Sequence, residues 1–236
     1  MKTLTKRDKK IQEKLGTTNS ANKLYEIEEA LQILKGLPPV KFDQTIQIAL
    51  NLGIDPKKSE HQIRGAVSLP KGIGKSRKVI VFAAGDEAKT AREAGADEVG
   101  ADELIKKITE GWTDFDVAIA PPNMMKIISK LGKILGPQGK MPSPKNGTVT
   151  EEIANAVKEF KAGKVEFRID AAGIIHAPLG KLSFSVPDLK QNIEAFLEHI
   201  QSQRPISAKG VFIKKATLSA TMSPGFPLKL APTGSR

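Results

Sequence analysis

The hydrophobic pattern of this sequence changes twice along the chain, and these changes constrain the fold more than any other feature. Between residues 72 and 161, short apolar runs at 79–84 and 116–120 alternate with segments of helical spacing. The expected helices are 86–94, 101–111 and 124–135. Alternating strands and helices are typical of a parallel sheet with crossover helices. The middle of the chain is therefore predicted to be an α/β domain.

Both ends of the chain show strands with one apolar face instead. Apolar and polar residues alternate in four segments, 46–52, 165–169, 182–186 and 216–220. Helical spacing is found at 27–34 and 189–200. One-sided strands with few helices predict a two-layer α+β domain with a mainly antiparallel sheet. Neither end has enough faces to close a core alone, so we expect residues 1–71 and 162–236 to fold together, with 72–161 inserted.

The basic excess lies in the two ends of the chain. The protein has a formal net charge of +11 at pH 7. Residues 1–71 and 162–236 together hold 23 basic and 13 acidic side chains, whereas residues 72–161 hold 14 and 13. This excess favours a polyanionic partner, with nucleic acid as the leading candidate. A second basic patch, or simply a solvated helix face, is predicted from Lys126, Lys130, Lys133, Lys140 and Lys145.

Composition excludes several classes of protein. With 236 residues, 39% of them hydrophobic, the chain can bury a core and is not globally disordered. No apolar run approaches the roughly 18 residues of a membrane span, and the first residues are basic without an apolar signal core. We therefore expect a cytoplasmic protein without membrane association. The sequence has no cysteine, which excludes disulfides and thiolate chemistry.

The motifs of nucleotide-dependent enzymes are incomplete. Residues 74–76 resemble the end of a P-loop, but Leu69 stands where its first glycine is required. The turn after the first apolar run offers Gly85 alone, so a pyrophosphate cradle is missing. No partner at metal-ligand spacing accompanies the three histidines, His61, His176 and His199. We expect no catalytic residue, metal or cofactor; the alternative is an enzyme that binds a nucleotide through an unrecognised loop.

Strand parity turns a set of polar side chains toward one face. They are Thr45 and Gln47; Lys164, Glu166, Arg168 and Asp170; Lys181, Ser183 and Ser185; and Thr217, Ser219 and Thr221. Hydroxyls, Lys and Arg beside a basic amino-terminal segment can contact the phosphates and ribose 2′-hydroxyls of structured RNA. The alternative is a face that is merely solvated. DNA is less favoured because no recognition helix stands out.

A family resemblance adds to this interpretation. Residues 131–149, LGKILGPQGKMPSPKNGTV, resemble the signature of the bacterial-type large-subunit ribosomal proteins of the L1 family. Further blocks follow the order of that family: KFDQT at 41–45, LGIDP at 52–56, RGAVSLP at 64–70, EAGAD at 93–97, GWTDFD at 111–116, AGKVEFR at 162–168, IHAPLGK at 175–181 and TMSP at 221–224. The resemblance covers residues 25–224.

The resemblance implies a fold and a function. It implies a discontinuous RNA-binding domain with an inserted three-layer Rossmann-like α/β domain, joined by two linkers that permit hinge opening. It implies a structural constituent of the large ribosomal subunit that binds large-subunit rRNA, forms the mobile stalk at the tRNA exit site and assists release of deacylated tRNA. It also implies a translational repressor that binds its own operon mRNA. Contact with tRNA would be indirect or transient, and the protein would be ribosome-associated and a monomer when free.

The resemblance also implies the RNA-binding residues. They are Lys41, Phe42, Thr45, Glu166, Arg168, Asp170, Thr221, Met222 and Ser223, and the motifs place His176, Lys181 and Ser183 near the same surface. Strand parity alone would turn Phe42 toward the core, on the side of Ile46. A bulge near Gln44 would reconcile this orientation with RNA contact. The hinge is expected at Pro70, Gly72, Gly74 and Gly163.

Overall fold

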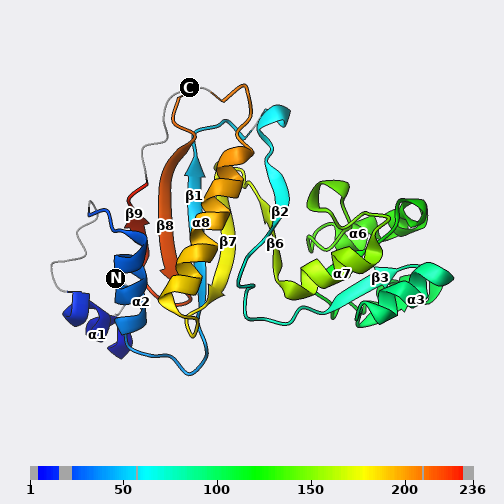
Figure 1. The fold of residues 1–236 in the computed structure, drawn as a ribbon, viewed down its shortest axis with the longest axis horizontal. Coiled ribbons are helices and arrows are strands. Elements are labelled where there is room, and N and C mark those ends of the chain that lie inside the picture. The colour runs from blue at the N-terminus through cyan, green and yellow to red at the C-terminus, as the bar shows by residue number, and fades with distance from the viewer. Residues whose placement is uncertain (1–4, 16–22, 57, 209, 231–236) are drawn as a thin grey trace. The chain divides into compact units, whose positions relative to one another are not determined.

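The computed structural model describes residues 5–15, 23–56, 58–208 and 210–230, and the chain separates into two compact units (Figure 1). Unit 1 comprises Met1–Ile63 and Arg168–Arg236, and unit 2 comprises Arg64–Phe167. Residues 64–71 and 162–167, predicted to belong with the chain ends, group by contacts with unit 2. The domains 1–71, 72–161 and 162–236 stay a prediction.

Unit 1 is built on a four-stranded sheet. The strands are β1 (Thr45–Leu52), β7 (Ile174–Lys181), β8 (Ile213–Ala220) and β9 (Phe226–Leu228), in the order β7-β1-β8-β9. All neighbours are antiparallel, as predicted. Two helices, α2 (Ile27–Gly36) and α8 (Val186–Ser202), pack on this sheet (Figure 1). Unit 1 also holds α1 (Lys6–Leu15) and the 3-10 turn η2 (Ser59–His61).

Alternation along the strands explains which face of the sheet is buried. In β1, Ile46, Ile48 and Leu50 are fully buried, whereas the residues between them are exposed or half-buried. Phe196 of α8 is also fully buried. The apolar face of the sheet therefore lies in the core with α2 and α8, and the other face remains polar.

The predicted strand at 182–186 is wrong. Strand β7 ends at Lys181, the next residues form a turn, and α8 begins at Val186. Ser185 caps this helix, because its Oγ accepts a hydrogen bond from the Asp188 backbone N–H at 3.2 Å. A proline follows in the first turn, where its missing N–H costs nothing. Local capping thus overrides the apolar alternation of Leu182, Phe184 and Val186.

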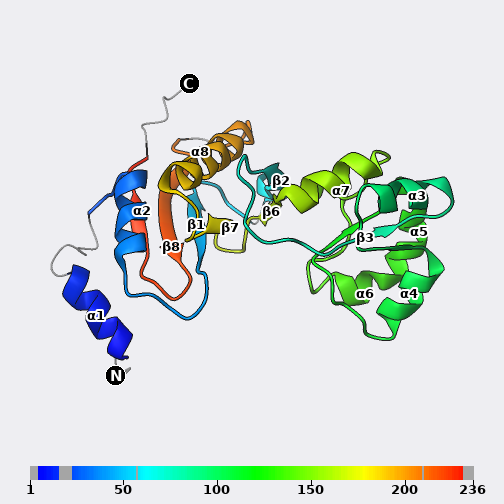
Figure 2. The same cartoon turned by 60° about the horizontal axis from the view of Figure 1, so that its bottom comes forward.

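Unit 2 contains a three-stranded sheet in the order β4-β3-β5. Its strands are parallel, as predicted. The strands are β3 (Val79–Phe82), β4 (Glu98–Gly100) and β5 (Val117–Ile119). Helices α3 (Asp86–Glu93) and α7 (Ile153–Ala162) lie on one side of the sheet, and α4 (Asp102–Thr109) and α6 (Gly132–Leu135) lie on the other (Figure 2). Alternate residues of β3 enter two separate cores, so this sheet is buried on both faces.

Some elements of unit 2 differ from the prediction in detail. The helix expected at 124–135 is a series of short 3-10 and α-helical turns: η3 (Pro122–Met124), α5 (Met125–Ile128), η4 (Ser129–Leu131) and α6. Ser129 bonds back to the Lys126 carbonyl at 2.7 Å, a bond typical of an interrupted helix. Strands β4 and β9 were missed because three residues are too short to show a period. Among the described residues, no helix is long and apolar enough to cross a membrane.

A two-stranded ribbon belongs largely to unit 2. It pairs β2 (Arg64–Ser68) with β6 (Lys164–Arg168), and the 3-10 turn η5 (Pro144–Asn146) packs against β2. Beside it the chain comes close to itself at two glycines. A Cβ on Gly163 would lie 2.8 Å from the Cα of Gly72, and both residues have positive φ, +110° and +63°. Glycine is therefore required at both positions.

Candidate nucleic-acid interface

One end of the sheet in unit 1 gathers eight of the twelve predicted RNA-binding residues. The end is formed where β1 starts and where β7 and β8 finish, since Thr45 pairs with Lys181 and Ile46 with Ala220. The loops before β1 and after β7 and β8 carry the remaining members. We call this group the strand-end cluster: Lys41, Phe42, Thr45, Lys181, Ser183, Thr221, Met222 and Ser223.

Hydrogen bonds between the three strand ends fix the hydroxyls of the strand-end cluster. The Thr45 backbone N–H donates to Thr221 Oγ1 at 3.2 Å, and the Thr221 N–H donates to the Thr45 carbonyl at 3.0 Å. The Thr221 hydroxyl donates to the same carbonyl at 3.2 Å. Lys181 Nζ donates to Thr45 Oγ1 at 3.0 Å. Residues far apart in the sequence are thus held in one arrangement before any ligand binds.

Two supporting residues of this cluster were missed by the sequence analysis. Asp43 accepts from the Ser183 hydroxyl at 2.8 Å and from the Ser183 N–H at 3.3 Å. Gln44 is buried, and its Nε2 donates to the Thr221 carbonyl and, at 3.1 Å, to Ser223 Oγ. The acids predicted for the RNA surface were Glu166 and Asp170, and Asp43 was not among them. The available signal was the position of Asp43 and Gln44, two polar residues directly before an alternating strand.

The internal bonds determine which groups are left for a ligand. Thr45 Oγ1 already accepts from Lys181, so its proton remains to donate. Ser223 Oγ accepts from Gln44 and from Arg7 Nη2, at 3.1 and 3.3 Å, so its proton remains as well. By contrast, the hydroxyl protons of Ser183 and Thr221 are used inside the protein. The cluster therefore presents two hydroxyl donors beside the Lys181 ammonium.

Two large apolar side chains of the cluster are exposed. Phe42 is 52% exposed and Met222 is 74% exposed. Phe42 lies in the loop before β1, because the strand starts only at Thr45. The parity argument that turned Phe42 toward the core therefore does not apply, and the bulge expected near Gln44 is not needed. The irregularity in the pairing of β1 with β7 falls between Ile46 and Gln47.

The polar face of the same sheet runs away from the strand-end cluster. Its residues pair across the strands, Gln47 with Ser219, Ala49 with Thr217 and also with His176, and Asn51 with Lys215. We call this surface the open face: Thr45, Gln47, Ala49, Asn51, His176, Lys215, Thr217 and Ser219. From Thr45 to Asn51 it extends about 20 Å, at about 3.3 Å per residue. The outward orientation predicted for Thr45, Gln47, Thr217 and Ser219 is confirmed.

Three further predicted residues lie toward the far end of the open face. Asp170 is in the turn before β7, where Oδ1 accepts from the N–H groups of Ile174 and Ala172 at 2.8 and 2.9 Å. These donors, led by Ile174, hold the pKa of the Asp170 carboxyl below its usual range. The exposed His176 places Nε2 3.9 Å from the Asp170 carboxylate, and Arg168 is exposed two residues before Asp170. Asp170 therefore presents a stable negative charge beside an imidazole.

The twelfth residue, Glu166, belongs to unit 2 and makes its contacts there. Its Oε2 accepts from Asn146 Nδ2 at 2.8 Å, and burial raises the pKa of its carboxyl. The nearby Arg77 favours the charged form, but burial is the larger effect. Glu166 is half-buried, whereas Arg168 on the same strand face is exposed. The two residues share the predicted parity but differ in their access to a ligand.

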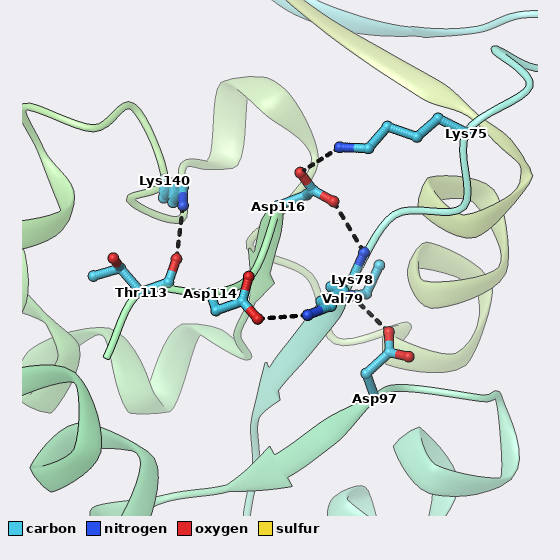
Figure 3. Close-up of polar contacts among 8 residues, drawn as sticks. All are labelled: Lys75, Lys78, Val79, Asp97, Thr113, Asp114, Asp116 and Lys140. Atoms are coloured by element: carbon cyan, nitrogen blue, oxygen red, sulfur yellow. Dashed lines mark hydrogen bonds and ion pairs between the residues drawn. The ribbon is translucent and has the colours of Figure 1, made fainter. Parts of the chain in front are cut away.

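Several acidic side chains of unit 2 are held by lysines or by backbone N–H groups of the same unit. Asp116 accepts from Lys75 Nζ at 3.0 Å and from the Lys78 N–H at 3.1 Å, while Asp97 accepts from the Val79 N–H at 2.8 Å (Figure 3). Lys140, counted in the second basic patch, donates to the Thr113 carbonyl at 2.8 Å. The other four lysines of that patch are exposed: Lys126, Lys130, Lys133 and Lys145. The two bonds of Asp116 tie the segment before β3 to the start of β5, which is a structural role.

Comparison with known proteins assigns the chain to a family. The Ribosomal protein L1p/L10e family matches residues 33–224. The chain belongs to this family. Among its relatives, the large ribosomal subunit protein uL1 of Protochlamydia amoebophila (strain UWE25) is 53% identical over 210 residues, which are 89% of this chain and 89% of that protein. Membership of a ribosomal protein family confirms the resemblance seen in the sequence, and it places the chain among ribosome constituents rather than enzymes.

Proposed function

We propose that this chain is a constituent of the large ribosomal subunit and binds large-subunit rRNA directly through unit 1. The observation that carries this proposal is the strand-end cluster, in which three strand ends fix hydroxyls and a lysine by mutual hydrogen bonds. A surface held in one arrangement loses little conformational freedom on binding and so recognises RNA by shape. The family assignment and the large-subunit name of the relative in Protochlamydia amoebophila support the same conclusion.

The chemistry of the cluster suits the ribose-phosphate backbone. Thr45 and Ser223 offer hydroxyl protons to phosphate oxygens or to a ribose 2′-oxygen. Lys181 adds a positive charge that releases counterions from the RNA. The exposed Phe42 and Met222 offer apolar surface to a ribose or an unstacked base. The charge of Lys181 would therefore supply affinity, and the fixed positions of the hydroxyl and apolar groups would supply selectivity.

The open face extends this contact toward Asp170 and His176. A carboxylate repels phosphate but accepts a hydrogen bond from a 2′-hydroxyl, a group that DNA lacks. Asp170 is an ionised acceptor at neutral pH, and its lowered pKa extends this state to more acid solution. Arg168, two residues away, supplies a compensating charge for a phosphate. This end of the open face would then distinguish RNA from DNA.

The finer roles belong to the same proposal. The protein would form the mobile stalk at the tRNA exit site, contact tRNA there only indirectly or transiently, and assist release of deacylated tRNA. Two chain crossings, at 63–64 and 167–168, join the units. The same surface would bind the message of its own operon and repress its translation. The protein would be cytoplasmic and ribosome-associated, and a monomer when free.

A double replacement in the strand-end cluster tests the proposal. Phe42→Ala with Thr221→Val removes an exposed ring and the hydroxyl that joins two strand ends. We expect a loss of about a hundredfold in affinity, since a stacked ring and a hydrogen bond are each worth about 1–2 kcal/mol. Affinity for an rRNA stalk fragment and for the operon message is measured by filter binding, and both should fall together. A loss confined to one RNA would show that the two surfaces differ.

The matched control is Ile127→Ala, which also truncates a partly exposed apolar side chain but lies in unit 2. It should leave both affinities within about twofold of the unchanged protein. Thermal unfolding of each variant separates a lost contact from a lost fold. Equal losses in the control and the double variant would refute binding through unit 1.

A further inference from the structure

Met222 adopts a strained backbone in the middle of the strand-end cluster. Its φ is +63°, and it is the one non-glycine residue with positive φ in the part of the chain that the structure describes. A non-glycine residue in this region costs about 1–2 kcal/mol relative to ordinary backbone. Strain of this kind persists only where neighbouring groups hold it. The turn at 221–223 therefore needs a support.

The support comes from the amino-terminal helix. Arg7 of α1 donates through Nη1 to the Met222 carbonyl and through Nη2 to Ser223 Oγ at 3.3 Å. Its Nε donates to the Pro38 carbonyl at 3.3 Å. One guanidinium thus spans the turn after β8 and the loop that leads to Lys41 and Phe42. The planar fork of arginine can bond several acceptors at once, which a lysine ammonium cannot do in the same geometry.

Helix α1 is seated by more than this residue. Ile11 and Leu15 are buried, and Lys14 Nζ donates to the Gly36 carbonyl at 2.9 Å. Arg7 is half-buried, whereas Lys6, Lys9 and Lys10 are exposed on the same helix. The contacts of Arg7 involve the main chain of Met222, while the Met222 side chain stays 74% exposed. The helix fixes the turn without covering its apolar tip.

We propose that Arg7 is a positioning residue for RNA recognition, which holds the strained Met222 turn and the Pro38 loop in the arrangement that RNA binds. The inference rests on the proposed function, and it adds helix α1 to the recognition surface. Arg7 acts through Met222 and Ser223 and not by contact with a phosphate. Ser223 is the shared acceptor of Gln44 and Arg7, so the helix and the sheet are coupled through its oxygen.

The test measures the order of the turn and the affinity for RNA in the same full-length variants. Methionine methyl groups are labelled with carbon-13, and the Met222 signal among the five methionines is assigned with Met222→Leu. Arg7→Ala should shift or broaden this signal in the free protein. It should also weaken binding to an rRNA stalk fragment about tenfold, as expected for lost hydrogen bonds to a charged group. Arg7→Lys, which keeps the charge, should show an intermediate loss.

Lys10→Ala is the matched control, because it removes one positive charge from an exposed position of the same helix. It should leave the Met222 signal unchanged and weaken binding less than about threefold. Salt dependence separates positioning from phosphate contact: Arg7→Ala should keep the salt slope, whereas loss of a phosphate contact lowers it by about one. In a double-mutant cycle, Arg7→Ala and Ser223→Ala should be less than additive.

Each outcome decides one of the two claims. If the unchanged protein does not bind the rRNA fragment, the proposed function fails. The Met222 signal alone then tests whether Arg7 holds the turn at 221–223. If the unchanged protein binds and Arg7→Ala matches Lys10→Ala in affinity and in the Met222 signal, the positioning role is refuted. A lowered salt slope with an unmoved Met222 signal would also overturn it, because Arg7 would then contact a phosphate directly. If Arg7→Ala unfolds unit 1, the affinity and the Met222 signal of Arg7→Lys decide whether Arg7 has the positioning role.

Discussion

The two units use their sheets in opposite ways. In unit 2 both faces of β3 are buried, with Val79 and Val81 in one core and Ile80 and Phe82 in the other. In unit 1 the helices α2 and α8 pack on the sheet, and the outward residues of β1 and β8 remain exposed or half-buried. A sheet with one polar face keeps side chains of several strands in a fixed array for a ligand. The proposed binding surface thus exists because, in the described part of the chain, no second layer of helices covers this face of the sheet.

The charges of the two units follow the same division. Residues 1–63 and 168–236 hold 20 basic and 12 acidic side chains, whereas residues 64–167 hold 17 and 14. Several charges of unit 2 form ion pairs inside it, such as Lys75 with Asp116 at 3.0 Å. In unit 1, Lys181 is bonded to neutral oxygens, so its charge stays uncompensated by that contact. Unit 1 therefore combines excess charge with an open surface.

The largest expected effect concerns the packing of unit 2. Gly163→Ala places a Cβ 2.8 Å from the backbone of Gly72 and Ile73, at a φ of +110°. We expect a destabilisation of about 3 kcal/mol or more, from backbone strain and from the clash together. Trp112, the only tryptophan, reports on unit 2, and Tyr25, the only tyrosine, reports on unit 1 when labelled with fluorine. In Gly163→Ala, the urea midpoint of the Trp112 transition should fall, whereas that of the Tyr25 transition should stay unchanged.

Gly139→Ala controls for backbone strain alone. Its φ is +70°, but nothing lies within 4 Å of an added Cβ. The cost should be about 1 kcal/mol, since only the unfavourable φ remains. A Tyr25 transition that shifts together with Trp112 in Gly163→Ala would show that the units unfold as one and would weaken the contrast between them.

Replacing single lysines tests the contrast in binding. Lys181→Ala removes a charge and the bond that orients Thr45, so affinity for the rRNA fragment should fall about tenfold, or 1.4 kcal/mol. Lys126→Ala removes an equal charge from an exposed position of α5 in unit 2 and should change affinity less than about twofold. The affinities of both variants for the rRNA fragment are measured by fluorescence anisotropy at two salt concentrations. Similar losses would mean that the RNA also spans unit 2.

Helix capping gives a smaller effect, confined to unit 1. Ser185→Ala removes the acceptor of the Asp188 N–H at the start of α8. Loss of an N-cap hydroxyl costs about 1 kcal/mol. Ser185→Asp should restore most of it, because aspartate caps equally well. Urea unfolding followed at Tyr25 measures the change, and an unchanged midpoint in Ser185→Ala would show that the cap is not needed.

The smallest expected effects are two pH dependences of opposite sign. The lowered pKa of Asp170 means that its contribution is present above the ordinary aspartate pKa, about 3.9, and is lost as pH falls through the folded value. The raised pKa of Glu166 means that unit 2 gains stability as pH falls through the folded value. Asp170→Asn and Glu166→Gln should remove these dependences, each from its own unit, in urea unfolding between pH 3 and pH 7. If the two replacements removed pH dependences of the same sign, the assignments would be contradicted.

Much of the fold was predictable because it rests on simple periods. Alternating apolar and polar residues predicted β1, β6 and β8, and continuous apolar runs predicted β3 and β5. A strand buried on one face requires the first pattern, and a strand buried on both faces requires the second. The same rule failed at 182–186, where Ser185 and Pro187 start a helix despite alternating apolar residues. A capping residue with a proline in the first turn was the stronger signal. At 182–186 the capping signal, which satisfies a backbone hydrogen bond, therefore outweighed the alternation of apolar residues.

The candidate site was predictable in its outline but not in its supports. Strand parity identified Thr45 and Thr221, because orientation repeats every second residue. It could not show that Asp43 orients Ser183, since a contact across 140 positions depends on tertiary packing. Nothing in the basic amino-terminal segment distinguishes Arg7 from its neighbours, although its guanidinium donates to the Met222 carbonyl. Residues that position others carry no periodic signal of their own.

Crosslinking mass spectrometry of the full chain bound to large-subunit rRNA tests the central claim most directly. With short-range ultraviolet crosslinks, peptides from β1, from the end of β7 and from 221–223 should carry most of the attached nucleotides. Peptides from 72–161 should carry few. Crosslinks found chiefly within 72–161, at comparable protein recovery, would contradict an interface built on the open face and strand-end cluster of unit 1.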